Sequence, residues 1–544
     1  MKKYFFLVFL SFLFCFESKS QRIIDVPFTS DDKISIDGIL EQKEWENSEK
    51  LSLNFETEPG YNTTPVVETV GFIQYSENFL YVAFHAKTNE PVRAAIRKRD
   101  DMGSLGNDLI GISIDTYGDG RNNVFIGSNP LGSQIDVRIL NSLTDEGRYD
   151  LAYDLEYESI GVIGDNEYYV ELKIPFSSIS FSNNKIQKWK FSFVRRYLDY
   201  AISTSKDDRN NSCITCQLND FIVLDKFKVD RKFDLLPYIS SNLVGNKDDN
   251  SESMNYDKIK PNFGVGINAE LSKNLSLELT INPDFSQVEA DVTKIDANSA
   301  YTLSYPEKRP FFNNGVDVLK LNSSDLQPFY SRSINDPLYA LKMLNQGENS
   351  RFLFLSSIDR NSPYLIAGND QSYFGEGGRS LINILRYQHL LGKGSKIGIL
   401  SSSRVYKDGG YGNLFGVDGL IQISNNIRFA FDILKNFNLE PNKNWIDSDH
   451  YFGERTINLD GEKFNGSGIS LGITRKTERW TTYVGYKHID PNYRADVGFA
   501  VKNDRKWITL LQSHNKFWNN GFIKTASFTV KKDILYDFTN NLDV

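Results

Sequence analysis

The sequence predicts an all-β protein in two parts: an N-terminal antiparallel β-sandwich followed by an incomplete antiparallel transmembrane β-barrel. Short apolar segments alternate with Gly, Asn and Asp turns along the whole chain, and long helical patterns are absent. The pattern also changes along the chain. Strands are short up to about residue 227, and beyond about residue 230 they lengthen and keep a strict two-residue period.

The first twenty residues have the organisation of a secretory signal. Lys2 and Lys3 supply a positive start, residues 4–16 are apolar, and the segment ends in the small residues around Ser18 and Ser20. The apolar run is shorter than the roughly 20 residues that a membrane-spanning helix needs. We therefore expect residues 1–20 to be a signal peptide that is cleaved after export.

We expect residues 21–228 to form the sandwich. Residues 70–75 and 79–84 are apolar segments joined by the short turn 76–78, and residues 109–115 and 123–127 flank the turn 117–120. Residues 168–174 close the series before Pro175. Because no crossover helices separate these strands, an antiparallel sandwich is the expected arrangement.

We expect residues 229–544 to form the barrel. Phe263, Val265 and Ile267 alternate with Gly264 and Gly266, and the same period returns in residues 427–433 and 469–473. A soluble sheet can also alternate in this way, so a large secreted β protein is the alternative. Strands of about 9–11 residues with alternating tight turns and long loops favour an outer-membrane protein in contact with lipid. The final residues lack the usual closing amphipathic strand, so we expect a C-terminally truncated barrel.

Charge and cysteine content restrict the partners. With 62 basic and 70 acidic residues the formal net charge is −8, so the chain has no general positive field for nucleic acid. Export leaves Cys213 and Cys216, for which a disulfide is expected. A zinc site would need about two more ligands, and a redox motif would need a helix beside a βαβ pattern.

Three motifs in the first part carry a resemblance to a known family. They are Ile36-Asp37-Gly38 with Glu41 and Trp45, then Asp115 to Arg121 with Asn129-Pro130, then Tyr169 to Phe176. Together they resemble the family nine carbohydrate-binding module found at the front of large outer-membrane proteins of Bacteroidota-type bacteria. The resemblance implies a β-sandwich that binds polysaccharide or oligosaccharide.

The second part resembles the uncharacterised β-barrel family that follows such modules. The resemblance is carried by three motifs in order: residues 282–291 (NPDFSQVEAD), residues 305–312 (YPEKRPFF) and residues 329–332 (FYSR). Members of that family usually continue further, which agrees with the expected truncation.

Candidate ligand-binding residues follow from the module resemblance and from local spacing. Tyr153 and Tyr157, four residues apart on a predicted strand, would share one face and could stack on sugar rings, although core packing would use the same pattern. Trp45 is a third candidate, again with core packing as the alternative. Asp115, Asp119 and Asn122 could hold calcium, while Asp-Gly is also a common hairpin turn.

The stretch from Pro283 to Phe312 mixes charges and aromatic rings. If it folds inside the barrel, its charged residues would line or gate the lumen, and a structured periplasmic turn is the alternative. The residues in question are Asp284, Glu289, Asp291, Glu307, Lys308 and Arg309.

The sequence thus predicts an outer-membrane protein whose N-terminal module binds carbohydrate and presents or guides it at a barrel. Nucleophile elbows, phosphate loops and His-Glu-x-x-His motifs are absent, and the five histidines have no ligand spacing. Whether the chain is an enzyme is left open: an enzyme of carbohydrate catabolism, acting on O-glycosyl bonds by family association, is one alternative. A structural or secretion-related barrel with a non-binding module is another.

Overall fold

The computed structural model describes most of the chain after residue 21. The described residues are 22–101, 108–141, 148–151, 153–182, 184–228, 232–243, 245–246, 255–256, 258–272, 274–283, 307, 309–368, 371–446, 448, 451–452, 455–500, 502–518, 523–539 and 542–543. The predicted signal peptide, residues 1–20, lies outside them.

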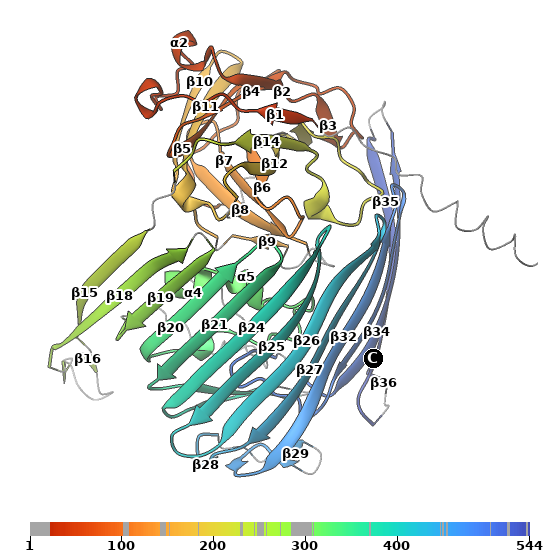
Figure 1. The fold of residues 1–544 in the computed structure, drawn as a ribbon. Coiled ribbons are helices and arrows are strands. Elements are labelled where there is room, and N and C mark those ends of the chain that lie inside the picture. Colours follow the sequence, from red (N-terminus) through yellow and green to blue (C-terminus); the bar gives the residue numbers. More distant parts are fainter. Residues whose placement is uncertain are drawn as a thin grey trace, which may run out of the picture.

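The N-terminal part is a sandwich of two sheets (Figure 1). The larger sheet has the order β1 (Ile23–Asp25), β14 (Asp220–Leu224), β12 (Gln187–Tyr197), β6 (Leu109–Asp115), β7 (Asn122–Ser128), β8 (Gln134–Leu140) and β9 (Tyr149–Asp150), with β13 (Tyr200–Ser203) and β3 (Phe55–Glu58) attached to β12. The smaller sheet has the order β10 (Glu158–Gly164), β11 (Glu167–Pro175), β5 (Phe79–Lys87), β4 (Thr69–Tyr75) and β2 (Glu49–Ser52).

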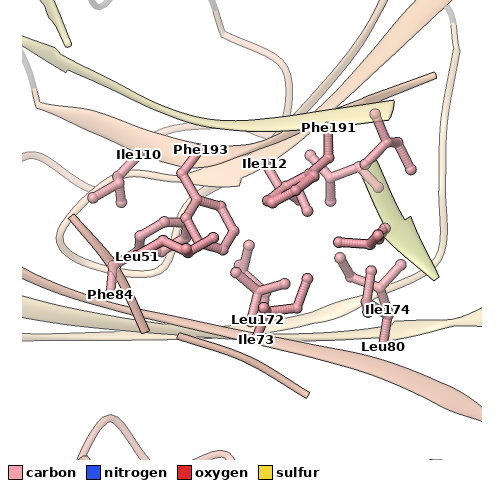
Figure 2. Close-up of a cluster of buried hydrophobic side chains, with 14 of the residues drawn as sticks. Leu51, Ile73, Leu80, Phe84, Ile110, Ile112, Leu172, Ile174, Phe191 and Phe193 are labelled. Atoms are coloured by element: carbon pink, nitrogen blue, oxygen red, sulfur yellow. The ribbon is translucent and has the colours of Figure 1, made fainter. Parts of the chain in front are cut away.

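Alternate residues of the two sheets meet in one apolar core. Figure 2 shows Ile110 and Phe193 of the larger sheet facing Phe84 and Leu172 of the smaller one, and all four side chains are fully buried. The rings of Phe84 and Phe193 lie 5.1 Å apart in an edge-to-face arrangement. Each such side chain contributes about 1.5–3 kcal/mol by leaving water, so this core sets the position of the loops around it.

The outer face of the smaller sheet is covered by residues 34–45, which include the short helix α2 (Gln42–Trp45). Glu171 on β11 fixes this cover, because its carboxylate accepts hydrogen bonds from the backbone N–H of Asp37 at 3.0 Å and of Gly38 at 2.7 Å, and from the Trp45 indole at 3.0 Å. Burial nevertheless raises the pKa of Glu171 to about 7, since the three donated hydrogen bonds offset only part of the desolvation.

The second part is one large antiparallel sheet that curls around a short inner segment (Figure 1). Its order is β15 (Phe233–Asn242), β18 (Lys260–Ser272), β19 (Leu275–Ile281), β20 (Pro337–Gln346), β21 (Ser350–Asp359), β24 (Ser380–Gly392), β25 (Ser395–Tyr406), β26 (Tyr411–Ser424), β27 (Ile427–Leu439), β32 (Lys463–Lys476), β33 (Trp480–Ile489), β34 (Arg505–Phe517), β35 (Thr525–Tyr536) and β36 (Leu542–Asp543). The predicted all-β fold class is confirmed. Among the described residues this sheet remains open.

The two ends of the large sheet differ. At the end nearest the sandwich, the strands are joined by short connections: the tight turns 347–349, 393–394, 425–426 and 477–479, and the sequence stretches 273–274 and 518–524. At the far end the connections are mostly long: 243–259, 282–336, 360–379, 440–462 and 490–504, together with the short 407–410 and 537–541. Four small hairpins lie in these far loops: β16 (Gly245–Asn246) with β17 (Asn255–Tyr256), β22 (Pro363–Ala367) with β23 (Ser372–Glu376), β28 (Asn442–Lys443) with β31 (Leu459–Asp460), and β29 (Tyr451–Phe452) with β30 (Arg455–Thr456).

The outer face of the large sheet carries apolar side chains, and its inner face carries both charged and apolar ones. Ile399, Val417 and Ile433 are register partners on three adjacent strands and point outward with 56%, 44% and 42% of their surfaces exposed. Their inward neighbours include Asp418 and Asp432, which are almost completely buried. Outward apolar and inward charged side chains alternate along each strand because successive residues of a strand point to opposite faces of the sheet.

The concave side of the sheet holds residues 309–336, which we call the inner segment. It contains α4 (Pro310–Asn313), α5 (Val316–Leu319) and the 3-10 turn η4 (Ser331–Ser333). Phe312 and Val318 pack on inward apolar residues of the sheet. Asp432 of β27 accepts hydrogen bonds from the backbone N–H of Ser323 and from Asn322, so the inner segment is fixed to the wall by polar contacts as well.

Asp317 joins the sandwich to the inner segment and to the large sheet. Its buried carboxylate on α5 pairs with Arg138 of the sandwich at 2.8 Å and with Arg351 of the large sheet. Burial alone would raise the pKa of Asp317, but the charges of the two arginines outweigh it and hold this pKa well below its usual range. None of the helices in the described part of the chain combines the length and the hydropathy required to cross a bilayer.

Changing Glu171 should alter the pH dependence of folding. Because the folded pKa is raised from 4.5 to about 7, the stability it contributes is fully present below pH 4.5 and is lost as the pH rises through about 7. That change corresponds to about 3 kcal/mol. Urea unfolding of the full chain in detergent at about pH 5 and about pH 8 should show this loss in the wild type and not in Glu171→Gln. Equal pH dependence of the two proteins would contradict the assignment.

Removing the charge of Asp317 should destabilise the whole protein. Asp317→Asn leaves Arg351 buried without this counter-charge and leaves Arg138 with Asp150 alone, which costs about 3–5 kcal/mol. The midpoint of urea unfolding should fall accordingly, whereas Asp165→Asn at the exposed β10–β11 turn should stay within about 0.5 kcal/mol of the wild type. Similar midpoints for the two variants would show that the buried bridge is not required.

Candidate functional site

The predicted sugar platform is wrong for two of its three rings. Trp45 and Tyr157 are 2% and 7% exposed, so neither presents a face to a ligand. The Tyr157 hydroxyl donates to the carbonyl of Gly127 at 2.8 Å, and the Trp45 indole is held by Glu171. The spacing of Tyr153 and Tyr157 predicts that they share a face of a strand, and the Tyr157 side chain points into the core.

Tyr153 lies in the connection before β10 and is half-buried. The guanidinium of Arg138 lies 4.6 Å from the centre of its ring, and Arg138 also pairs with Asp317. Tyr153 therefore belongs to the contact between the sandwich and the inner segment. It does not form a platform with Tyr157.

The predicted calcium ligands are occupied by protein donors. Asp115 accepts hydrogen bonds from the backbone N–H of Gly118 and Gly120, both at 2.9 Å, and Asp119 binds the Arg121 guanidinium at 2.9 Å. Asn122 opens β7 immediately afterwards. These contacts account for the segment as a hairpin turn, which is the alternative stated above.

Cys213 and Cys216 form a disulfide. It closes the loop that packs beside the turn 393–394, since a side chain added at Gly394 would lie 2.8 Å from the Cys213 sulfur.

The predicted lumen residues are described only in part. Asp284, Glu289, Asp291 and Lys308 lie outside the described residues. Glu307 and Arg309 form an ion pair at 2.8 Å, and Arg309 also donates to the carbonyls of Ser331 and Ile334. Arg309 therefore closes the inner segment on itself at the concave side of the sheet.

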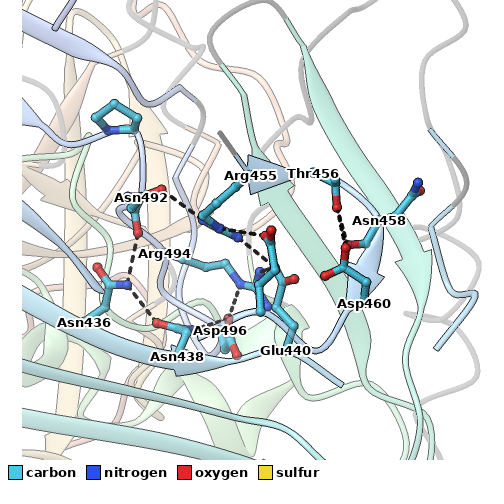
Figure 3. A network of polar contacts seen from close by, with 12 residues as sticks. Asn436, Asn438, Glu440, Arg455, Thr456, Asn458, Asp460, Asn492, Arg494 and Asp496 are labelled. Carbon is cyan, nitrogen blue, oxygen red and sulfur yellow. Dashed lines mark hydrogen bonds and ion pairs between the residues drawn. The ribbon is translucent and has the colours of Figure 1, made fainter. Parts of the chain in front are cut away.

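A polar network joins the far loops, as Figure 3 shows. Glu440 accepts hydrogen bonds from Arg455 at 2.8 Å and from Arg494 at 2.9 Å, and Arg494 also binds Asp496. Burial raises the pKa of Glu440 to about 8. Glu440 also lies within reach of Asp460 and Glu462, but two arginines already supply positive charge there, so the cluster is explained as loop-to-loop bridging.

A groove of about 630 Å³ on the sandwich brings rings and polar groups together. It lies beside β3 and the loop after β13, and the residues around it are Arg22, Ser52, Asn54, Phe55, Tyr61, Asn62, Thr204, Ser205, Lys206, Asp207, Asp208, Asn219 and Asp220. Phe55 and Tyr61 are half-buried, so part of each ring is open to solvent, and Asn54 and Lys206 are exposed.

Two loops are locked together to build this groove. The side chain of Asn62 and the backbone of Asp207 exchange two hydrogen bonds of 2.8 Å, which fixes loop 59–63 to loop 204–209. Arg209 reinforces the pair, because its guanidinium lies 4.6 Å from the Tyr61 ring centre and donates to the carbonyl of Thr57 at 3.0 Å. The groove is thus preformed in the folded chain.

The polar rim of the groove offers acceptors and donors. Arg22 and Asp220 form an ion pair at 2.8 Å on one side. Asp207 also lines the groove, and burial raises its pKa. Flat apolar rings beside carboxylates, amides and a cation are the groups that bind the apolar faces and hydroxyls of a sugar.

Sequence reasoning missed this groove. Phe55 and Tyr61 are far in sequence from Asp207, so their proximity depends on the pairing of β3 with β13. One local feature of the sequence could have indicated the groove. Tyr61 lies between Gly60 and Asn62 in a polar turn, where an aromatic side chain has no core to enter.

Residues 231–352 match the family model described as a domain of unknown function (DUF5916). No curated protein matches the chain.

Three solved structures resemble the chain at low sequence identity. A protein of Bacteroides uniformis with a proposed carbohydrate-binding role is 12% identical, with 38% of this chain and 100% of that chain covered and a TM-score of 0.31. A family nine carbohydrate-binding module from Caldicellulosiruptor kristjanssonii in complex with glucose is 18% identical, with 38% and 96% covered and a TM-score of 0.26. OmpT, an outer membrane protein of Vibrio cholerae, is 9% identical, with 57% and 99% covered and a TM-score of 0.20. At these values the likenesses define neither the ligand nor the location of this chain.

Proposed function

We propose that the chain is an outer-membrane protein whose N-terminal module, residues 21–228, binds carbohydrate and presents it at the β-barrel domain that starts at residue 229. The observation that carries sugar binding is the preformed groove between Phe55 and Tyr61 with its polar rim. Cleavage of residues 1–20 on export belongs to the same proposal, as does the pairing of a family nine-like module with the barrel family that accompanies it.

The apolar outer face of the large sheet supports the membrane location. Large apolar side chains point outward from most of its strands, among them Leu385, Ile399, Phe415, Val417 and Ile433. Water-soluble proteins rarely expose contiguous apolar surface of this extent, because each square ångström in contact with water costs about 25 cal/mol. Lipid removes that cost, while the buried charged side chains inside remain paired.

The position of the groove supports presentation of the ligand to the barrel domain. Arg209 stacks on Tyr61 from the sandwich and also lies 3.7 Å from the ring centre of Phe517 on β34. The wall of the groove formed by Tyr61 therefore lies next to the end of the large sheet, which places a bound glycan close to the barrel domain.

Removing the Tyr61 ring should weaken carbohydrate binding. Tyr61→Ala deletes one stacking face, worth about 1.4 kcal/mol, so affinity should fall about tenfold. Affinity gels containing soluble glucans, xylans or mannans, run with the full chain in detergent, would measure the change as lost retention.

Two variants make this test specific. Tyr61→Trp keeps a flat ring and should retain binding, and Tyr149→Ala removes an exposed ring on β9 outside the groove and should have no effect. Wild-type chain that migrates unretarded through every polysaccharide would contradict sugar binding by the module.

A charge on the outer face should separate a lipid-facing sheet from a water-facing one. Val417→Arg lies in the middle of β26, flanked by Ile399 and Ile433. In lipid it should cost about 2–4 kcal/mol and reduce the amount of protein in the outer-membrane fraction. In water, an exposed substitution of this kind changes stability by about 0.5 kcal/mol or less.

The matched control is Ile186→Arg, which charges an exposed isoleucine in a loop of the sandwich. It should leave stability and membrane yield unchanged. If Val417→Arg behaved like Ile186→Arg, the outer face would be in water and the membrane location would be wrong.

A further inference from the structure

The sandwich contacts the tight turns of the large sheet. Gly394 in the turn 393–394 donates its N–H to the carbonyl of Asp119 at 2.8 Å, and its carbonyl accepts from Asn141 at 3.3 Å. The backbone N–H of Ser212 donates to the carbonyl of Asn425 at 2.7 Å. Three separate segments of the sandwich therefore reach two of these turns.

The hairpin 115–121 docks on a third turn. Tyr117 donates its hydroxyl to the carbonyl of Gln346 at 2.9 Å, and Arg121 donates to the carbonyls of Gly347 and Glu348 at 2.8 Å and 2.6 Å. A fourth turn, residues 477–479, is contacted by Asn210, whose side-chain oxygen accepts a hydrogen bond from the backbone N–H of Glu478 at 3.0 Å.

These contacts make the sandwich a fixed part of the molecule. Many of these hydrogen bonds go to backbone groups of the turns, whose positions are fixed by the strands they connect. The buried ion pair between Arg138 and Asp317 adds a connection to the inner segment. Domains joined only by a linker move independently, whereas a docked interface with buried charge pairs holds one orientation. The side on which the sandwich lies is therefore set by the direction of the sheet.

The asymmetry of the connections gives that direction. In outer-membrane barrels the short turns face the periplasm and the longer loops face the outside of the cell. The turn 393–394 lies at the sandwich end, whereas β28 and β29 of the connection 440–462 lie at the opposite end (Figure 1). We propose that the sandwich is periplasmic and that its groove binds a glycan present in the periplasm.

This inference rests on the proposed outer-membrane location and sugar binding, and it narrows the ligand class. A surface-facing module would capture large extracellular polysaccharide. A periplasmic one meets only glycan made in the periplasm or oligosaccharide small enough to enter it. The inner segment packs on the concave side of the sheet and the sandwich lies at the periplasmic end, so the far end that carries β28 and β29 is the part that meets the outside.

Cysteine labelling of whole cells tests the orientation. Asn47→Cys places a thiol on the exposed turn after α2 in the sandwich, and Lys407→Cys places one in the exposed connection between β25 and β26 at the far end. The probe is a maleimide carrying a large polyethylene glycol, which cannot cross an intact outer membrane. The unsubstituted chain, whose Cys213 and Cys216 are joined, serves as the control and should not react.

The expected result is labelling of Lys407→Cys in intact cells, and of Asn47→Cys only after the outer membrane is permeabilised. Labelling of Asn47→Cys in intact cells would overturn the periplasmic assignment while leaving the membrane location in place. Recovery of both variants in the soluble fraction would overturn the membrane location and this inference together, and cell fractionation distinguishes that failure from the first.

Discussion

The two-residue period of the β-strand is the constraint on which the rest of this structure depends. In the large sheet it places Ile399, Val417 and Ile433 on one face and Asp418 and Asp432 on the other. A charged inner wall can remain buried only if its charges find partners, and the inner segment supplies some of them through Asn322, Ser323 and Asp317. The wall and the segment inside it are therefore interdependent.

The same requirement extends to the sandwich. Arg138 is buried beside Tyr153 and is neutralised in part by Asp317, which belongs to the inner segment. Residues that resemble a binding-module motif thus have structural roles here: Asp115 and Asp119 shape a turn, Arg121 docks that turn on the large sheet, and Glu171 holds the opening segment. Their side chains are engaged within the protein and do not face the groove.

The sequence was a good guide to the strands and a poor guide to the site. Alternation along residues 427–433 predicts the two faces of β27, because that property is local. The rings Tyr153 and Tyr157 were wrongly paired as a platform, since spacing along a strand tells which residues share a face and not whether that face is covered. The groove was missed because Tyr61 meets Asp207 only through the pairing of β3 with β13.

The central claim, that the sandwich binds carbohydrate between loops 59–63 and 204–209, is tested most directly by hydrogen exchange. Backbone amides of the full chain in detergent would be followed by mass spectrometry with and without a cello-oligosaccharide or another oligosaccharide that the affinity gels identify. Slower exchange confined to these two loops is the predicted result, because a bound ligand stabilises the loops that contact it. Unchanged exchange in both loops, with protection elsewhere in the sandwich, would contradict the account.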